Sequence, residues 1–301
     1  MSHFYFALTN PEAMPLLELE MNLRFPELRK SYSRPGFLTL KAEMSIPFKA
    51  HFARISGVCL GKFKLEDLKF PKAWVWKREE DLVIPDQLQE LSEASMFKMG
   101  EKVTLIMMIT QDEYWVGEYQ LLRTHFQTPG EVSSIIEREV PSRAYYKIAE
   151  LYESFDLPFD HQERVLELGS APGGASLFLL EQDLNVLGVD PAEMHPSITK
   201  NFYFKHLKVP FETLREDDFK NGVDWIISDI NLPPHVVLKE VHRLEAFLEP
   251  KGIILTLKIG EEKYLRSLPF YLEDFRKKGF TVDLKYVPSF RQEIALIALR
   301  S

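Results

Sequence analysis

From residue 142 onward, short apolar runs alternate with longer segments whose apolar residues recur every three or four positions. The first pattern is typical of buried strands, and the second is typical of amphipathic helices. The expected strands cover residues 165–168, 186–189, 224–229, 252–258, 281–287 and 293–299, and the expected helices cover 142–155, 175–182, 233–247 and 264–277. This alternation predicts an α/β domain with a mostly parallel sheet, closed by two strands that a short turn joins as a hairpin.

The first 125 residues follow a different rhythm, in which strands dominate. Strands are expected at residues 4–8, 37–41, 53–60, 103–109 and 114–122, and helices at 11–25 and 85–99. We interpret residues 1–45 as a small α+β unit and residues 46–125 as a second unit. Residues 126–140, which include Pro129 and Gly130, are expected to form a linker to a domain that covers residues 141–301.

Composition narrows the class of protein. The 301 residues are 45% hydrophobic and 27% charged, as in ordinary globular proteins. Cys59 is the one cysteine, so no intrachain disulfide can form, and we expect a cytoplasmic protein without a metal site. No apolar run has the length of a membrane span, and we expect neither a membrane anchor nor a cleaved leader.

Charge is unevenly distributed along the chain. Residues 24–78 contain thirteen Lys and Arg against four Asp and Glu, a net +9, so that the remainder of this −8 chain carries −17. A basic segment beside an acidic body is typical of a protein that holds a polyanion, such as RNA, on a separate platform. A lysine-rich solvated surface gives the same count, and composition leaves both interpretations open.

A glycine-rich turn follows the first strand of the α/β domain. The sequence V-L-E-L-G-S-A-P-G-G runs from Val165 to Gly174 and leads into a helix, which indicates a loop where a ligand can approach bare backbone. The spacing G-x-x-x-G-G differs from the dinucleotide fingerprint and lacks the Lys-Ser/Thr pair of a phosphate loop. A cofactor without phosphates, S-adenosylmethionine, fits it. Asp190 ends the next strand, where a carboxylate can bind a ribose diol.

Charged side chains also occur where the later strands end. Asp229 and Lys258 each terminate an apolar strand, and Glu293 begins the last, antiparallel strand. Because these positions share the edge at which open α/β sheets bind ligands, we expect them to meet beside the cofactor. Lys147 lies on the helix before the first strand of the sheet and is the fourth candidate. Surface ion pairing is the competing interpretation for each residue taken alone.

These motifs together resemble those of the FtsJ-like RNA 2′-O-ribose methyltransferases. The resemblance covers residues 140–301 and rests on P-S-R-A-Y-Y-K at 141–147, L-G-S-A-P-G-G at 168–174, Ser228-Asp229, Leu257-Lys258 and Glu293. It implies a class I, Rossmann-like methyltransferase fold that binds S-adenosylmethionine, and a Lys-Asp-Lys-Glu tetrad at Lys147, Asp229, Lys258 and Glu293. The layout of the N-terminal part resembles a ferredoxin-like unit followed by a THUMP-like RNA-binding domain. Together these features are similar to the RlmM-type branch, which methylates a cytidine ribose of 23S ribosomal RNA.

The resemblance also implies roles for individual residues. It implies that the cofactor is bound by the loop residues and by three acids: Gly169, Pro172, Gly173, Gly174, Ala175, Asp190, Asp218 and Asp229. Asp218 resembles the family acid that contacts the adenine amine, Asp217 is its close rival, and a turn cap is an equal alternative for both. Two positions depart from the family: Ala175 replaces a frequent Trp, and the sequence after Asp229 lacks the usual Met-Ala-Pro-Asn.

The chemistry requires an oriented ribose hydroxyl that loses its proton as the carbon–oxygen bond forms. Lys258 is the candidate for a base or for a steering hydrogen-bond partner, and burial beside Lys147 is expected to lower its pKa. We expect a monomer that binds RNA through the basic N-terminal region. A tRNA or mRNA-cap substrate and a non-catalytic RNA-binding scaffold remain alternatives. The sequence specifies neither the nucleotide nor whether the substrate is naked RNA or a ribosomal particle.

Overall fold

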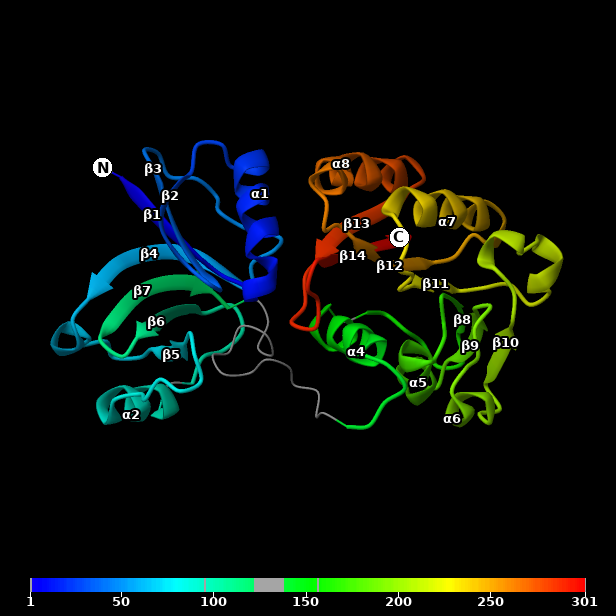
Figure 1. Ribbon diagram of the computed structural model, residues 1–301, viewed down its shortest axis with the longest axis horizontal. Helices are drawn as coiled ribbons and strands as arrows, with labels where there is room; N and C mark the ends of the chain where they lie inside the picture. The colour runs from blue at the N-terminus through cyan, green and yellow to red at the C-terminus, as the bar shows by residue number, and fades with distance from the viewer. Residues whose placement is uncertain (1, 95, 122–137, 156, 301) are drawn as a thin grey trace. The chain divides into compact units, whose positions relative to one another are not determined.

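The chain divides into two compact units, Met1–Ser134 and Ile135–Ser301 (Figure 1). The computed structural model describes residues 2–94, 96–121, 138–155 and 157–300. Most of the expected linker at residues 126–140 lies outside these described ranges. The two units have separate sheets, and each is described by itself.

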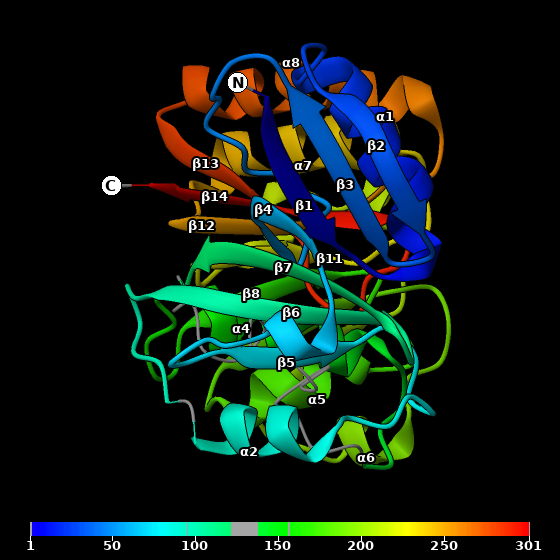
Figure 2. The ribbon, with the colours of Figure 1, turned by 90° about the vertical axis from the view of Figure 1, so that its left-hand side faces the viewer.

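The N-terminal unit is built on a seven-stranded sheet with the order β2-β3-β1-β4-β7-β6-β5 (Figures 1 and 2). Its elements are β1 (His3–Leu8), α1 (Met14–Arg24), β2 (Arg29–Arg34), β3 (Phe37–Ala42), β4 (Ile55–Phe63), β5 (Trp74–Lys77), α2 (Asp86–Ala94), β6 (Lys102–Thr110) and β7 (Glu113–Gln120). Strand β1 pairs with both β3 and β4. Residues 1–45 and 46–125, which the sequence pattern treats separately, therefore contribute strands to one sheet.

The strands β2 and β5 are absent from the sequence interpretation, and both lie at the edges of this sheet. The sequence of β2, R-K-S-Y-S-R, has no apolar alternation because none of its side chains is fully buried. In contrast, the residues of β6 from Val103 to Ile109 belong to two buried clusters on opposite faces, apart from the partly buried Thr104. Edge strands bury less surface than central ones and so carry a weaker sequence signal.

Folding neutralises the basic segment at residues 24–78. Residues 79–121 belong to the same unit and carry ten Asp and Glu against two Lys. Lys62 pairs with Glu113 at 3.1 Å and Lys72 pairs with Glu101 at 2.9 Å. Over residues 1–134, 16 basic and 18 acidic side chains leave a net charge of −2. The unit as a whole is therefore not basic, and positive charge can act only where it gathers locally.

The C-terminal unit alternates strands and helices, as the pattern predicts, and it also contains a short helix at Pro196–Thr199 and an edge strand at Phe204–Leu207 that the pattern does not predict. Its elements are α4 (Ala144–Phe155), β8 (Arg164–Leu168), α5 (Gly174–Glu181), β9 (Asn185–Val189), α6 (Pro196–Thr199), β10 (Phe204–Leu207), β11 (Trp225–Ser228), α7 (Pro234–Leu248), β12 (Gly252–Lys258), α8 (Glu262–Lys277), β13 (Phe280–Lys285) and β14 (Glu293–Arg300). Helices α4 and α5 lie on one face of the sheet and α7 and α8 on the other (Figure 1).

The sheet order is β10-β9-β8-β11-β12-β14-β13, and β14 runs antiparallel to both of its neighbours. Strands β8 to β12 pair in parallel, so their carboxyl ends share one edge. This is the Rossmann-like arrangement with an inserted antiparallel strand that defines class I methyltransferases, as expected from the sequence. The strands at the centre of the sheet are closely packed. Gly252 lies opposite the fully buried Trp225, and a Cβ on Gly252 would lie only 2.0 Å from the Trp225 ring, so a larger residue does not fit there.

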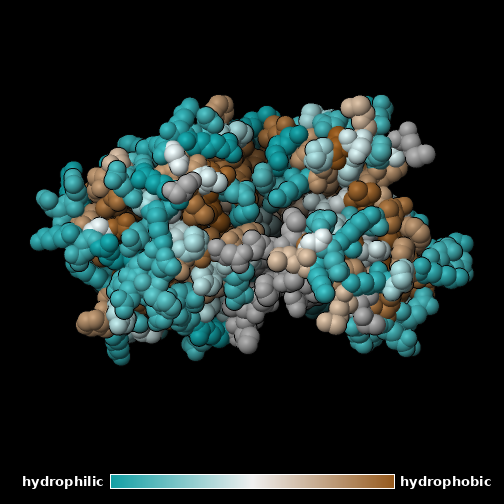
Figure 3. Space-filling model, turned by 180° about the vertical axis from the view of Figure 1, so that it is seen from behind, coloured by the Kyte–Doolittle hydropathy of each residue, from teal (hydrophilic) through white to brown (hydrophobic). Residues whose placement is uncertain are grey.

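Hydrophilic side chains cover much of the face drawn in Figure 3, with smaller apolar areas between them. The large apolar side chains of both sheets are mostly inside. Among the described residues, no helix combines the length and apolar character needed to cross a bilayer. The same part of the chain contains no cluster of three metal-ligating side chains.

Candidate active site

The glycine loop joins β8 to α5 at the carboxyl edge of the sheet. Gly169 and Gly173 have φ values of +75° and +112°, which only glycine adopts without strain. A Cβ on Gly169 would lie 2.5 Å from Ile230, and one on Gly174 would lie 2.5 Å from the carbonyl oxygen of Ser142. Gly169 and Gly174 therefore let the loop pack closely against the segments that carry Asp229 and Lys147, and Gly173 lets it pack against Ile198.

Asp190 lies beside this loop and holds it. One of its carboxylate oxygens accepts the backbone N–H of Ala171 at 3.1 Å, and the other accepts that of Ala192 at 2.8 Å. The backbone N–H of His195 donates to the carbonyl of Pro172 at 2.8 Å. Because a carboxylate has about four acceptor sites, these contacts leave Asp190 with acceptors for a ribose diol, the role that the sequence predicts.

Glu167 is a buried acid that sequence reasoning missed. It lies in β8, two residues before Gly169, and is 3% exposed. Its carboxylate accepts a hydrogen bond from the hydroxyl of Ser176 on α5. Burial raises the pKa of Glu167 to about 8, because desolvation outweighs the hydrogen bonds from Ser176. The available signal was a charged residue within the otherwise apolar run V-L-E-L.

The four candidate tetrad residues meet at the same edge. The ladder between β12 and β14 places Glu293 directly opposite Lys258, and their charged ends are 2.8 Å apart. Lys258 also contacts Asp229, which follows the neighbouring strand, at 2.7 Å. Lys147 reaches Asp229 at 3.0 Å and Glu293 at 2.8 Å. The two amines and two carboxylates thus form a closed ring in which every neighbour has the opposite charge.

The electrostatics of this ring correct one sequence-based expectation. Burial alone would lower the pKa of Lys258, but attraction to Asp229 and Glu293 outweighs it, and the pKa is raised. Burial would likewise raise the pKa of Glu293, but the two lysines outweigh it and the pKa is lowered. The lowered pKa expected from burial beside Lys147 is therefore not found, because the two carboxylates outweigh the burial. In the free protein Lys258 is therefore a cation.

The remaining predicted residues are placed as follows. Ala175 is buried in the first turn of α5, and Pro172 lies in the loop before it. Asp218 accepts the backbone N–H of Arg215 at 2.8 Å and so caps its own 3₁₀ turn, Glu216–Phe219, which was the alternative interpretation. None of the described hydrogen bonds or ion pairs joins Asp218 to the glycine loop or to Asp190. Its contact with adenine stays a prediction.

Comparisons with known proteins show what this chain is similar to. Residues 140–263 match the model of the FtsJ-like methyltransferase family. The ribosomal RNA large subunit methyltransferase M of Idiomarina loihiensis is 27% identical over 187 residues, 56% of this chain and 48% of that protein. The protein of the same name from Laribacter hongkongensis is 27% identical over 164 residues, 51% of this chain and 44% of that one.

The chain therefore spans about half the length of these two curated relatives. Among solved structures, TrmN from Thermus thermophilus covers 99% of this chain and 100% of its own, at 13% identity and a TM-score of 0.39. A TM-score this low does not establish a shared overall fold. Residues 140–263, within the C-terminal unit, are thus similar to the FtsJ-like methyltransferase family, and the sheet that contains them has the strand order expected for that family.

Proposed function

We propose that this protein is an S-adenosylmethionine-dependent RNA 2′-O-ribose methyltransferase. The observation that carries the proposal is the closed ring of Lys147, Asp229, Lys258 and Glu293 at the carboxyl edge of the sheet, where the glycine loop also lies. Ligands of open α/β sheets bind at this edge. An FtsJ-like domain with four assembled polar groups is suited to methyl transfer to a hydroxyl.

The loop fits a cofactor without phosphates. Gly169 and Gly173 expose backbone where any side chain would collide with Ile230 or Ile198. The backbone N–H groups that begin α5 and the carboxylates of Asp190 and Asp229 would hold the cofactor. S-adenosylmethionine supplies an electrophilic methyl group when it is bound, and so no metal is required for the reaction.

Lys258 is the group best placed to act on the ribose hydroxyl. A lysine has three N–H donors, and two of these are used by Asp229 and Glu293. The third is available to the 2′-oxygen, and the Lys258 side chain is 21% exposed whereas that of Lys147 is 12% exposed. As a cation, Lys258 orients the hydroxyl and stabilises negative charge that develops on the oxygen. Another cation brought beside it would favour its neutral form, in which it could accept the proton.

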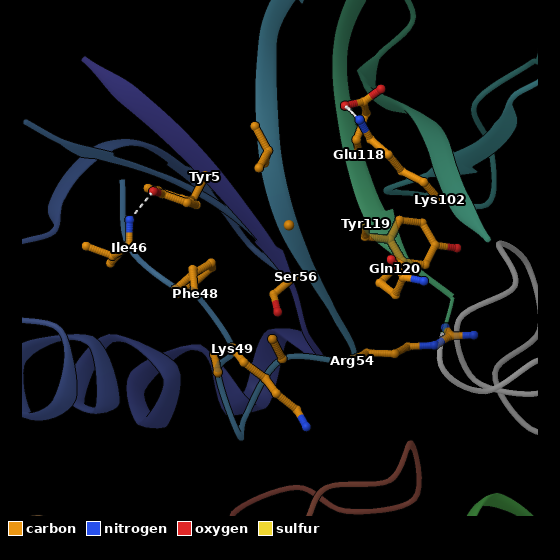
Figure 4. Close-up of a pocket in the computed structure, with 14 residues that line it drawn as sticks. Tyr5, Ile46, Phe48, Lys49, Arg54, Ser56, Lys102, Glu118, Tyr119 and Gln120 are labelled. Atoms are coloured by element: carbon orange, nitrogen blue, oxygen red, sulfur yellow. Dashed lines mark hydrogen bonds and ion pairs between the residues drawn. The ribbon is translucent and has the colours of Figure 1, made fainter. Parts of the chain in front are cut away.

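The N-terminal unit supplies a groove for the RNA. A cavity of about 440 Å³ crosses β1, β4 and β7, and its cationic lining residues are Lys49, Arg54 and Lys102 (Figure 4). Glu118 is the one acid in the lining and pairs with Lys102 at 2.6 Å. Tyr5 and Phe48 add aromatic rings. This local excess of positive charge, in a unit whose net charge is −2, supports binding of a phosphate backbone.

The names of the two relatives support large-subunit ribosomal RNA as the substrate class, and the family resemblance supports a cytidine of 23S RNA as the target. We further propose that the protein acts as a cytoplasmic monomer. The buried, free Cys59 accords with a reducing compartment.

The test is transfer of a labelled methyl group to RNA from a strain that lacks this gene, followed by nucleoside mapping. Label on a ribose of 23S RNA supports the proposal. Label on a base, or no label in any RNA, would refute the proposal. Label on a ribose of tRNA would show that tRNA, and not 23S RNA, is the substrate. Lys258→Ala should abolish transfer while S-adenosylmethionine still binds. The matched control is Lys263→Ala, because Lys263 is exposed and pairs only with residues of its own turn in the described contacts.

A further inference from the structure

The loop that carries Glu293 into the ring joins β13 to β14 at residues 286–292. This loop has a defined conformation of its own. The hydroxyl of Tyr286 donates to the carbonyl of Phe290 at 3.0 Å, and the N–H of Phe290 donates to the carbonyl of Val287 at 3.0 Å. Val287 and Phe290 are both fully buried. The loop can therefore be positioned as one piece by whatever holds it from outside.

Side chains of α4 and of the residue before it contact this loop. Lys147 and Glu150 are three positions apart in α4, so their side chains project from one side of the helix, and Arg143 immediately precedes the helix. The guanidinium of Arg143 donates to the carbonyl of Ser289 at 3.1 Å. The carboxylate of Glu150 accepts the N–H of Ser289 at 2.8 Å. Both backbone groups of one loop residue are thus bound by side chains that flank Lys147 on either side.

Lys147 lies between these two residues in the sequence and pairs with Glu293, the residue that follows the loop. Its amine is 2.8 Å from Glu293 and 6.0 Å from the centre of the Phe290 ring. The β12–β14 ladder fixes Glu293 against Lys258, but it does not fix either residue relative to α4. The distance between Lys147 and Glu293 depends on how α4 is held against residues 286–292. The two contacts to Ser289 are the specific polar contacts that hold α4 against residues 286–292.

We propose that Glu150, assisted by Arg143, is a positioning residue that docks residues 286–292 onto α4 and so closes the ring between Lys147 and Glu293. Glu150 is 2% exposed, and a buried carboxylate is costly unless its hydrogen bonds are satisfied. Arg143 is exposed, so its contact is weaker. The proposal rests on the proposed methyl transfer for its catalytic meaning, but the docking contact itself can be measured without turnover.

The experiment compares Glu150→Ala, Glu150→Gln and Glu245→Ala in the full chain. Glutamine keeps an oxygen that can accept the Ser289 N–H, whereas alanine does not. Glu245 is the matched control, because it is a 3% exposed acid on α7 that pairs with Lys278 and Arg300 and contacts no tetrad residue in the described contacts. Hydrogen exchange of a peptide covering residues 286–293 reports the docking, and single-turnover transfer reports the chemistry.

We expect Glu150→Ala to raise exchange in that peptide and to lower the rate of transfer on the order of 10- to 100-fold, with little change in cofactor or RNA affinity. Glu150→Gln should restore both to within a few-fold, and Glu245→Ala should change neither. Faster exchange with unchanged transfer would overturn the positioning role, as would an equal loss in Glu245→Ala or no recovery in Glu150→Gln. If the wild-type protein methylates no RNA, the proposed function fails, and the exchange result still decides whether the contact docks the loop.

Discussion

The buried acid Glu167 gives a prediction whose sign and size follow from its surroundings. Its pKa is raised from 4.5 to about 8, mainly because it is buried. Between these two values the folded protein keeps a proton on Glu167 that the unfolded chain has released. A group of this kind contributes full stability below pH 4.5, and the contribution falls as the pH rises towards 8. Replacement by Gln, which is neutral at every pH, should remove this dependence.

The magnitude is about 1.4 kcal/mol of unfolding free energy for each pH unit inside that window. From pH 6 to pH 8 the wild-type C-terminal unit should therefore lose about 2 to 3 kcal/mol more than Glu167→Gln. Every other titrating group is shared by the two proteins, so the difference isolates Glu167. The carboxamide can still accept the hydroxyl hydrogen of Ser176, and we expect the variant to fold normally at pH 6.

The assay is urea unfolding at pH 6, 7 and 8, followed by hydrogen exchange of peptides from β8 (Arg164–Leu168), which reports on the C-terminal unit by itself. Glu212→Gln serves as the control, because Glu212 is an exposed acid of the same unit. Parallel stability curves for wild type and Glu167→Gln across this range would refute the reasoning, since they would show that Glu167 is ionised in the folded protein.

Three further predictions follow from single contacts. Gly174→Ala places a methyl group 2.5 Å from the carbonyl oxygen of Ser142, and should cost about 1–3 kcal/mol and lower the melting temperature by several degrees; an unchanged melting temperature would show that α4 and α5 separate easily. Asp229→Asn removes the carboxylate that both lysines contact, and should lower the transfer rate by about 100-fold in a protein with an unchanged melting profile, whereas near-normal transfer would remove Asp229 from the mechanism. Arg54→Glu should weaken RNA binding on the order of tenfold and reduce its salt dependence, while Lys69→Glu, outside the groove, should not; equal losses would place the RNA elsewhere.

Most strands and helices of the C-terminal unit could be predicted from the sequence, and the parallel topology then predicts which strand ends lie together. Apolar runs predict the strands, and parallel strands bring their carboxyl ends to one edge. Asp229 and Lys258 could therefore be expected to be neighbours although they are 29 residues apart. Asp218 shows the limit, because an acid in a turn can serve its own backbone as well as a ligand.

The sequence by itself determined most strands and helices of the C-terminal unit and the glycine loop, because each is encoded in a short local pattern, and the family resemblance implied the four ring residues. Only the tertiary structure decided the charge of Lys258, the proton on Glu167 and the neutralisation of the basic segment. Each of these depends on which groups from distant segments lie within a few ångströms and on how much water is excluded. The docking of residues 286–292 by Glu150 belongs to the same class, since a hydrogen bond across 139 positions leaves no periodic signal in the chain.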